Sequence, residues 1–187
     1  FTAPSCNAFG RISPTTAEHV RDGLGLKPAG KLDFILDGGP CPIGIESTIV
    51  NCCGPRAEIL RHGAVTRAML EEALGYPVAD AGAAAPRASG RLKSHYAPRT
   101  PLELVPARLL PARCRELAGV RLALMASPAI AAGCRGDFAA RFAAEASPQA
   151  YGRALYGRLH ELDAAGAERL LIELPPPEPA WAAVNDR

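Results

Sequence analysis

Long hydrophobic runs are absent from this sequence of 187 residues. No stretch approaches about eighteen consecutive apolar residues, so no membrane-spanning helix is predicted, and the first residues lack the charged, apolar and small-residue regions of a secretory leader. Lysine is scarce, with 3 Lys beside 18 Arg, and the formal net charge is only +2, which does not indicate a broad basic face for nucleic acid. Hydrophobic residues make up 48% and charged residues 21% of the chain, so the sequence predicts a folded globular protein.

Several local signatures are missing as well. No Gly-x-Gly-x-x-Gly follows a predicted strand, no Gly-Lys-Ser/Thr completes a P-loop, and no Cys-x-x-Cys pair occurs, so the usual dinucleotide, P-loop and zinc patterns are not found. A chain of this length and apolar content needs no disulfides, and its cysteines are predicted to be free, mostly buried thiols of a cytoplasmic protein. They are Cys6, Cys41, Cys52, Cys53, Cys114 and Cys134.

The chain divides into three stretches by composition. Residues 1–78 alternate short apolar runs with turns, residues 79–101 form an Ala/Gly/Pro-rich linker ending in a polar motif, and residues 102–187 show a strand, helix, strand spacing. The last pattern predicts a small parallel α/β domain. The first residue is Phe1 rather than Met, and the end follows helical-looking residues 181–184. We therefore expect a piece of a longer protein.

The expected elements follow from periodicity, capping residues and turn signals. Ser13 or Thr15 is expected to cap the first helix, while Thr66 and Gly75 begin and end the second. In the first stretch we predict helices over 15–23 and 66–74 and strands over 32–36, 45–50 and 58–60. In the last stretch we predict strands over 102–105, 122–126 and 169–174, and helices over 111–117 and from Pro148 to Gly166.

Two motifs carry groups suited to phosphate. Ser5, Asn7 and Ser13 lie on a turn that leads into a helix N-terminus, which offers free backbone N–H groups and positive dipole. Arg61 stands at a strand end beside a glycine turn, where a guanidinium can grip a phosphate bidentately. An ordinary polar turn with a capped helix, and a solvated surface arginine, explain the same residues without a ligand.

Two further motifs carry mixed chemistry. After a Gly-Gly-Pro turn, Ser47 is expected on one face of a strand, with Glu46 and Thr48 on the other. In the linker, His95 could act as a general base near neutral pH and Tyr96 could stack on a base. A hairpin with Gly-Pro turns, and a loop pinned to a domain surface, are the corresponding alternatives.

Taken together, the motifs resemble a known family. The segments APSCNAFGRISPTTAEHV, ILDGGPCPIGIESTIV, ILRHGAVT and KSHYAPRTPL are similar, in order and spacing, to the long form of the threonylcarbamoyladenylate synthase family. The resemblance covers residues 1–101, and residues 102–187 match by position and α/β pattern. It implies the C-terminal half of a YrdC-like twisted open sheet, followed by a small Rossmann-like parallel α/β domain.

The resemblance also implies an activity. The family makes L-threonylcarbamoyl-AMP from L-threonine, bicarbonate and ATP with Mg²⁺, and releases pyrophosphate. Its product passes to a separate transferase complex that modifies tRNA, so neither direct tRNA binding nor a membrane partner is expected. In the long form, the linker lies across the nucleotide-binding face.

Site residues are carried over from the family motifs by position. The backbone at Ala3, with Ser47 and Thr48, would hold threonine. The implied ATP contacts are Ser5, Asn7, Ser13, Arg61, His95 and Tyr96.

The sequence departs from the family pattern at two points. Cys6 replaces a usual alanine, and the family's Lys-x-Arg motif does not occur, since the three lysines are Lys27, Lys31 and Lys93. Catalytic residues are therefore left unassigned, no metal ligand is expected among the residues of this chain, and the chain alone is expected to be inactive. An RNA-binding YrdC-like module and a hydrogenase-maturation carbamoyl transferase are the alternatives. The low net charge disfavours the first alternative. The second is disfavoured because the cysteine pairs of such transferases are missing and because the His-Tyr-Ala-Pro motif is present.

Overall fold

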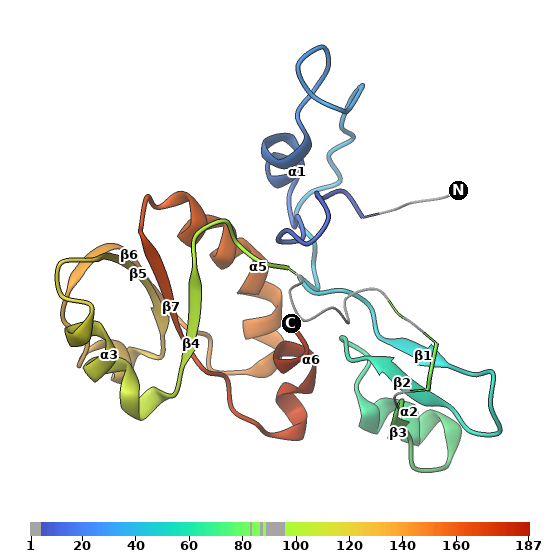
Figure 1. Ribbon diagram of the computed structural model, residues 1–187. Helices are drawn as coiled ribbons and strands as arrows, with labels where there is room; N and C mark the ends of the chain where they lie inside the picture. Colours follow the sequence, from blue (N-terminus) through green and yellow to red (C-terminus); the bar gives the residue numbers. More distant parts are fainter. Residues whose placement is uncertain (1–4, 83, 87, 89–95) are drawn as a thin grey trace.

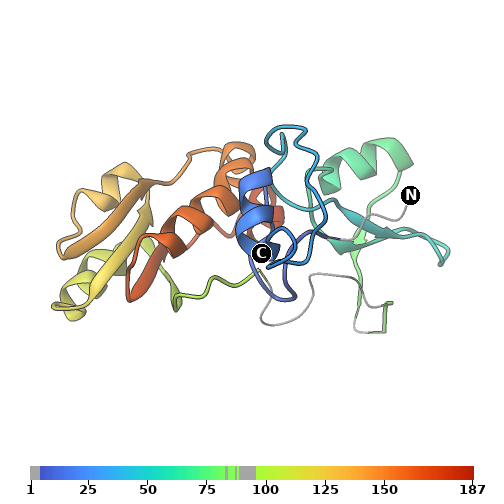
Figure 2. The ribbon, with the colours of Figure 1, turned by 90° about the horizontal axis from the view of Figure 1, so that it is seen from above.

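A computed structural model describes residues 5–82, 84–86, 88 and 96–187. Two sheets lie apart from each other, and the segment that carries α1 (Ala17–Leu24) stands between them in the view from above (Figures 1 and 2). The predicted α/β fold class is confirmed.

The larger sheet forms the C-terminal part. All of its neighbouring strands are parallel, as the strand, helix, strand spacing predicts. In spatial order they are β4 (Leu102–Val105), β7 (Arg169–Glu173), β5 (Arg121–Ala126) and β6 (Asp137–Ala143).

Helices cover both faces of this sheet. Leu122 and Leu124 pack on the side of α3 (Leu110–Glu116) and α4 (Pro128–Ala131), with the 3-10 turn Ala107–Leu109 leading into α3. Ala123 and Met125 pack on the side of α5 (Pro148–Ala164), the 3-10 turn Pro179–Trp181 and α6 (Ala182–Asn185). This alternation explains the unbroken apolar run of β5, because both of its faces are buried.

The smaller sheet belongs to the first part of the chain. β1 (Ile49–Asn51) pairs antiparallel with β2 (Glu58–Arg61), which pairs parallel with β3 (Ala79–Asp80). Between β2 and β3 lies α2 (Arg67–Leu74), where the Thr66 hydroxyl accepts from the Met69 N–H and Gly75 ends the helix at φ 74°. The predicted caps of this helix are confirmed.

Three expectations for the first part are wrong. Residues 32–36 form no strand: Leu32 makes an isolated bridge to Leu26, and Phe34 and Leu36 are 71% and 87% exposed. A strand needs a neighbour for its backbone hydrogen bonds, and the described residues offer this run none beyond that bridge. The strand predicted over 45–50 shortens to Ile49–Asn51. The cap of α1 is Thr16, whose side chain accepts from the His19 N–H.

The predicted burial of the cysteines is wrong for four of them. Cys114 and Cys134 are buried under the larger sheet, whereas the others are exposed in the loops of the first part. Burial and the neighbouring Cys134 raise the pKa of Cys114 to about 12, as expected for an inert structural thiol.

The first part packs directly on α5. Ile12, Tyr96 and the half-buried Ile45 join the core that α5 forms with the larger sheet. Gly44, at φ 85°, passes so close to α5 that a Cβ would lie 2.3 Å from the Arg153 carbonyl oxygen. Glycine is therefore required where the two parts of the chain meet.

Candidate functional site

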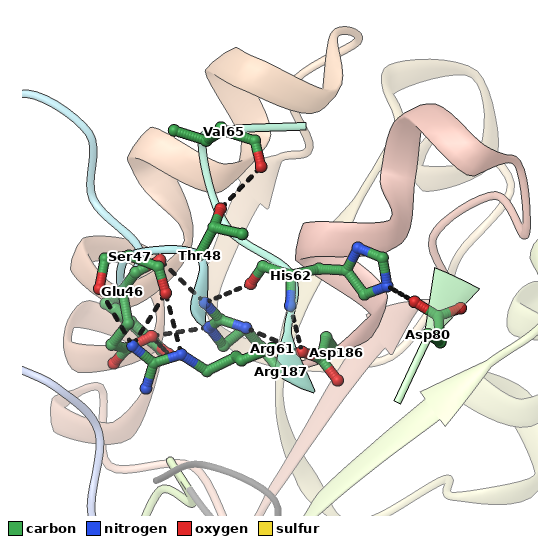
Figure 3. A network of polar contacts seen from close by, with 10 residues as sticks. Glu46, Ser47, Thr48, Arg61, His62, Val65, Asp80, Asp186 and Arg187 are labelled. Carbon is green, nitrogen blue, oxygen red and sulfur yellow. Dashed lines mark hydrogen bonds and ion pairs between the residues drawn. The ribbon is translucent and has the colours of Figure 1, made fainter. Parts of the chain in front are cut away.

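Ser47 and Arg61 are brought together by the β1–β2 pairing. The ladder places Ile49 opposite Arg61. The Arg61 guanidinium donates to the Ser47 carbonyl oxygen from Nε at 3.0 Å and from Nη2 at 2.9 Å, and Nη2 lies 3.4 Å from the Ser47 hydroxyl (Figure 3). Arg61 is only 7% exposed, so the interpretation as a solvated surface arginine is wrong.

Gly63 lets the two backbones approach this closely. A Cβ at this position would lie 2.3 Å from the Thr48 nitrogen and 2.6 Å from the Glu46 carbonyl oxygen. Such distances are far below van der Waals contact, so a larger residue would push the segments apart. The Arg-His-Gly sequence at the end of β2 thus fixes the geometry of Ser47.

Glu46 is the most heavily bonded carboxylate of this region. It accepts from the Ser13 hydroxyl at 2.5 Å, from the Tyr156 hydroxyl at 2.8 Å and from Arg187 Nε at 2.6 Å. Burial acts to raise the pKa of Glu46, but the hydrogen bonds from Ser13 and Tyr156, with the charge of Arg187, outweigh it and hold the pKa below its usual value. Glu46 is therefore ionised at neutral pH.

Arg187 closes the group from the C-terminal part. Its side chain is 2% exposed, and Nη2 donates to the Glu46 carbonyl at 3.1 Å and to the His62 carbonyl at 3.0 Å. Its guanidinium also lies 5.7 Å from the centre of the Tyr96 ring. Figure 3 shows the side chains of Arg61 and Arg187 converging on residues 46 and 47.

Thr48 points elsewhere. Its hydroxyl donates to the Val65 carbonyl oxygen at 2.7 Å, so it braces the turn before α2 (Figure 3). The implied contact of Thr48 with threonine remains a prediction.

The loop before α1 forms the other side of the site. Ser5 donates to the Asn7 side-chain oxygen, and the Asn7 amide donates to the Arg11 carbonyl oxygen at 2.9 Å. A cavity of about 670 Å³ is lined by both Ser5 and Ser13 of this loop and by Glu46. Ser5 and Ser13 of the loop thus face one space together with Glu46, the residue before Ser47.

The linker contributes Tyr96. Tyr96 is 6% exposed with φ 57°, and the next residue, Ala97, donates its N–H to the Gly10 carbonyl oxygen at 2.9 Å. Burial and the charge of Glu46 raise the pKa of Tyr96, so its hydroxyl stays protonated. The predicted contacts Ala3 and His95 lie outside the described residues.

Sequence reasoning missed three members of this group. Glu46 was singled out only for its place on a strand, and its partners Tyr156 and Arg187 lie 110 and 141 positions away. No local motif marks such distant partners.

The described residues carry neither a side-chain cluster for a metal ion nor a membrane-spanning helix. They contain no group of three or more His, Cys, Asp or Glu side chains placed to hold a metal ion. None of their helices is long and apolar enough to cross a bilayer.

The chain resembles known families and proteins over nearly its whole length. Residues 65–187 match the family described as "Threonylcarbamoyl-AMP synthase, C-terminal domain", and residues 1–63 match the family described as "Telomere recombination". Threonylcarbamoyl-AMP synthase of Bacillus subtilis is 30% identical over 195 residues, which span 99% of this chain and 55% of that protein. The Pyrococcus abyssi synthase is 35% identical over 101 residues, 51% of this chain and 28% of that protein.

The solved structures agree with the fold. A crystal structure of P. abyssi Sua5 complexed with L-threonine has a TM-score of 0.75 and 24% identity, and the match covers 98% of this chain and 55% of that one. This chain thus spans about half the length of the proteins it matches. Because one family's sequence model covers residues 65–187, well over half of the chain, the chain belongs to the threonylcarbamoyl-AMP synthase family.

Proposed function

We propose that the protein containing this chain makes L-threonylcarbamoyl-AMP from L-threonine, bicarbonate and ATP and releases pyrophosphate. One observation carries the proposal: the family's Ser47 and Arg61 are bonded to each other, and Glu46, the residue before Ser47, lines one cavity with Ser5 and Ser13. The family assignment, and the sequence motifs that follow one another in the family's order, support the same reaction.

Threonine is proposed to bind at the exposed hydroxyl of Ser47. The carbonyl of Ser47 is held by two nitrogens of Arg61, so the hydroxyl starts from a fixed backbone and loses little freedom on binding. A related P. abyssi protein has been crystallised with L-threonine. Ala3 and Thr48 complete the proposed threonine contacts.

ATP is proposed to bind between the loop before α1 and the Arg61 guanidinium. Ser5, Asn7 and Ser13 supply hydroxyl and amide groups to the nucleotide, and Arg61 supplies positive charge to its phosphates. Tyr96 and His95 of the linker complete the proposed ATP contacts. A divalent ion such as Mg²⁺ prefers phosphate and water oxygens in such sites, and it is proposed to arrive on the triphosphate, because the described residues build no cage of their own.

The reaction depends on positioning the substrates and on neutralising the charge of the phosphates, more than on a nucleophile supplied by the protein. The threonine nitrogen bonds to the carbon of bicarbonate with loss of water, and an oxygen of the resulting carbamate bonds to the α-phosphorus while the bond to pyrophosphate breaks. Residues of this chain orient the partners and neutralise charge that develops on the phosphates. The product is proposed to pass to a separate transferase complex for tRNA modification, and the net charge of +2 gives no support to direct tRNA binding.

The proposal is tested by pyrophosphate release from the full-length protein with Mg²⁺ and ATP. Release is expected only when L-threonine and bicarbonate are both present. Hydrolysis of ATP to ADP that ignores threonine would contradict the proposal, and binding of RNA without any turnover would favour the module alternative.

A further inference from the structure

We propose that Arg187 is a positioning residue for threonine: from the C-terminal part, it fixes the backbone on both sides of the Ser47–Arg61 pair. This inference rests on the proposed function, because it concerns the residues assigned to threonine and ATP there. Nothing in the local sequence around Ser47 or Arg61 indicates a partner at the far end of the chain.

One guanidinium reaches both segments of the pair. Nη2 of Arg187 donates to the carbonyl of Glu46, the residue before Ser47, at 3.1 Å, and to the carbonyl of His62, the residue after Arg61, at 3.0 Å. Nε of Arg187 donates to the Glu46 carboxylate at 2.6 Å. A single amino group, held in the guanidinium plane beside Nε, therefore bridges the two segments (Figure 3).

The sheet itself does not hold Ser47. The β1–β2 ladder begins with Ile49 opposite Arg61, so residues 46–48 precede it. The backbone of residue 62 is held a second time, because its N–H donates to the Asp186 carboxylate at 3.0 Å. Asp186 and Arg187 thus supply, from the C-terminal part, contacts that a longer ladder would otherwise supply.

The segment that carries Arg187 is anchored in the packed core of the C-terminal part. Arg187 lies two residues after the end of α6, whose Val184 is 5% exposed in the core. Trp181, just before α6, packs edge-on against Tyr151 of α5 with ring centres 5.4 Å apart. Tyr156, also on α5, bonds the Glu46 carboxylate. A packed core of this kind holds an attached side chain in one geometry. Through Arg187 and Tyr156, the C-terminal core therefore fixes the position of Ser47.

Stability alone does not account for this arrangement. Buried ion pairs are often no more stabilising than apolar residues of similar volume. Here Nη1 of Arg187 is buried with no hydrogen-bond partner among the described residues, 3.5 Å from Asp186. A buried guanidinium that leaves one nitrogen unbonded while bridging two carbonyls is better explained by geometry than by folding energy.

The test uses the full-length protein and Arg187→Lys, which keeps the positive charge but has one ammonium nitrogen in place of the two guanidinium nitrogens, Nε on the Glu46 carboxylate and Nη2 on the two carbonyls. Steady-state kinetics with varied threonine are expected to show a fall in kcat/KM of about ten- to a hundredfold. Arg158→Ala is the matched control, because Arg158 lies on α5 in an exposed ion pair with Glu161; it should change kcat/KM less than twofold.

A double variant separates positioning from plain stability. If Arg187 acts through Ser47, Arg187→Lys added to Ser47→Ala should lower threonine kcat/KM no further than Ser47→Ala alone. The inference is overturned if the losses in threonine kcat/KM multiply in the double variant, or if Arg187→Lys alone stays within twofold of wild type. Neither result affects the proposed function, which depends on the activity of the wild-type protein.

Asp186→Asn supplies a second readout if Arg187→Lys lowers the melting temperature. It weakens the bond to the His62 N–H and keeps the guanidinium, and a several-fold loss in threonine kcat/KM is expected. An unchanged value would count against the inference. A wild-type protein without threonine dependence would instead overturn the proposed function, and the inference with it.

Discussion

Glu46 and Arg187, 141 positions apart, form an ion pair of 2.6 Å in which the arginine side chain is 2% exposed. The carboxylate stands directly before Ser47, and the arginine stands at the end of the C-terminal part. Tyr156 on α5 binds the same carboxylate at 2.8 Å. The C-terminal domain of this family member is therefore built into the edge of the candidate site rather than attached beside it.

Removing the Glu46 carboxylate should be costly. Glu46→Ala removes the closer of the two carboxylates beside the buried Arg187 cation and leaves only Asp186, at 3.5 Å; breaking a buried pair costs about 3–5 kcal/mol. Denaturant unfolding measures the loss. Glu161→Ala is the control, because it removes an exposed partner of Arg158 and should cost at most about 1 kcal/mol. Equal losses for the two variants would contradict the burial of this pair.

Gly63→Ala should disturb the site through the backbone. The added Cβ would lie 2.3 Å from the Thr48 nitrogen, and overpacking of this kind costs about 1–3 kcal/mol. Threonine affinity should fall together with stability, as calorimetric titration and thermal unfolding can measure. Gly38→Ala is matched to it, since nothing lies within 4 Å of a Cβ there. An effect no larger than that of Gly38→Ala would show that the close approach is not needed.

Arg61→Ala should weaken both ligands of the proposed reaction. Loss of a charge-assisted contact to ATP costs about 1.5–3 kcal/mol, or roughly ten- to a hundredfold in affinity. Threonine affinity should also fall, because Arg61 holds the Ser47 carbonyl with two bonds. Arg56→Ala is the control, as Arg56 is exposed and lies over the Tyr76 ring. Unchanged ATP affinity by calorimetry would remove Arg61 from the nucleotide site.

The fold of the C-terminal part was predictable because its signals are local. The continuous apolar run of β5 and the Ser147-Pro148 start of α5 each indicate one structure, and both are found. Strand β6 was missed, since its Ala-rich sequence and half-buried residues give no clear alternation. The run over residues 32–36 has strand composition, but composition cannot supply the missing neighbouring strand.

The candidate site was predictable only in part. Ser47 and Arg61 are near each other in sequence and are joined by a hairpin, so their contact follows from the motifs that carry them. The Glu46 group depends on α5 and on the end of the chain, and its partners carry no local signal. Such a group forms only after the two parts of the chain pack, which a single sequence does not reveal.

The packing of α1 on α5 should depend on pH. The rings of His19 and His160 stack with centres 3.9 Å apart, and His160 Nε2 lies 3.2 Å from the Ser13 carbonyl oxygen. Burial, and next the neighbouring His160, lower the pKa of His19, although Glu18, Asp22 and Glu161 oppose the shift. The unfolded chain then takes up protons more readily than the folded one. The contribution of His19 to stability is complete above about pH 6.5 and is lost as pH falls through the folded pKa.

Thermal unfolding between pH 7.5 and 5 measures this dependence. The wild-type melting temperature should fall more steeply over this range than that of His19→Gln, which cannot be protonated. Parallel curves for the two proteins would show that His19 does not contribute to the pH dependence.

The most direct test of the central claim follows carbon from labelled bicarbonate in the full-length protein. With ATP, Mg²⁺ and L-threonine present, the label should appear in an AMP-linked product whose mass is that of threonylcarbamoyl-AMP, and it should vanish when threonine is omitted. Label that never enters an AMP-linked product, while ATP is still converted to ADP, would contradict the account.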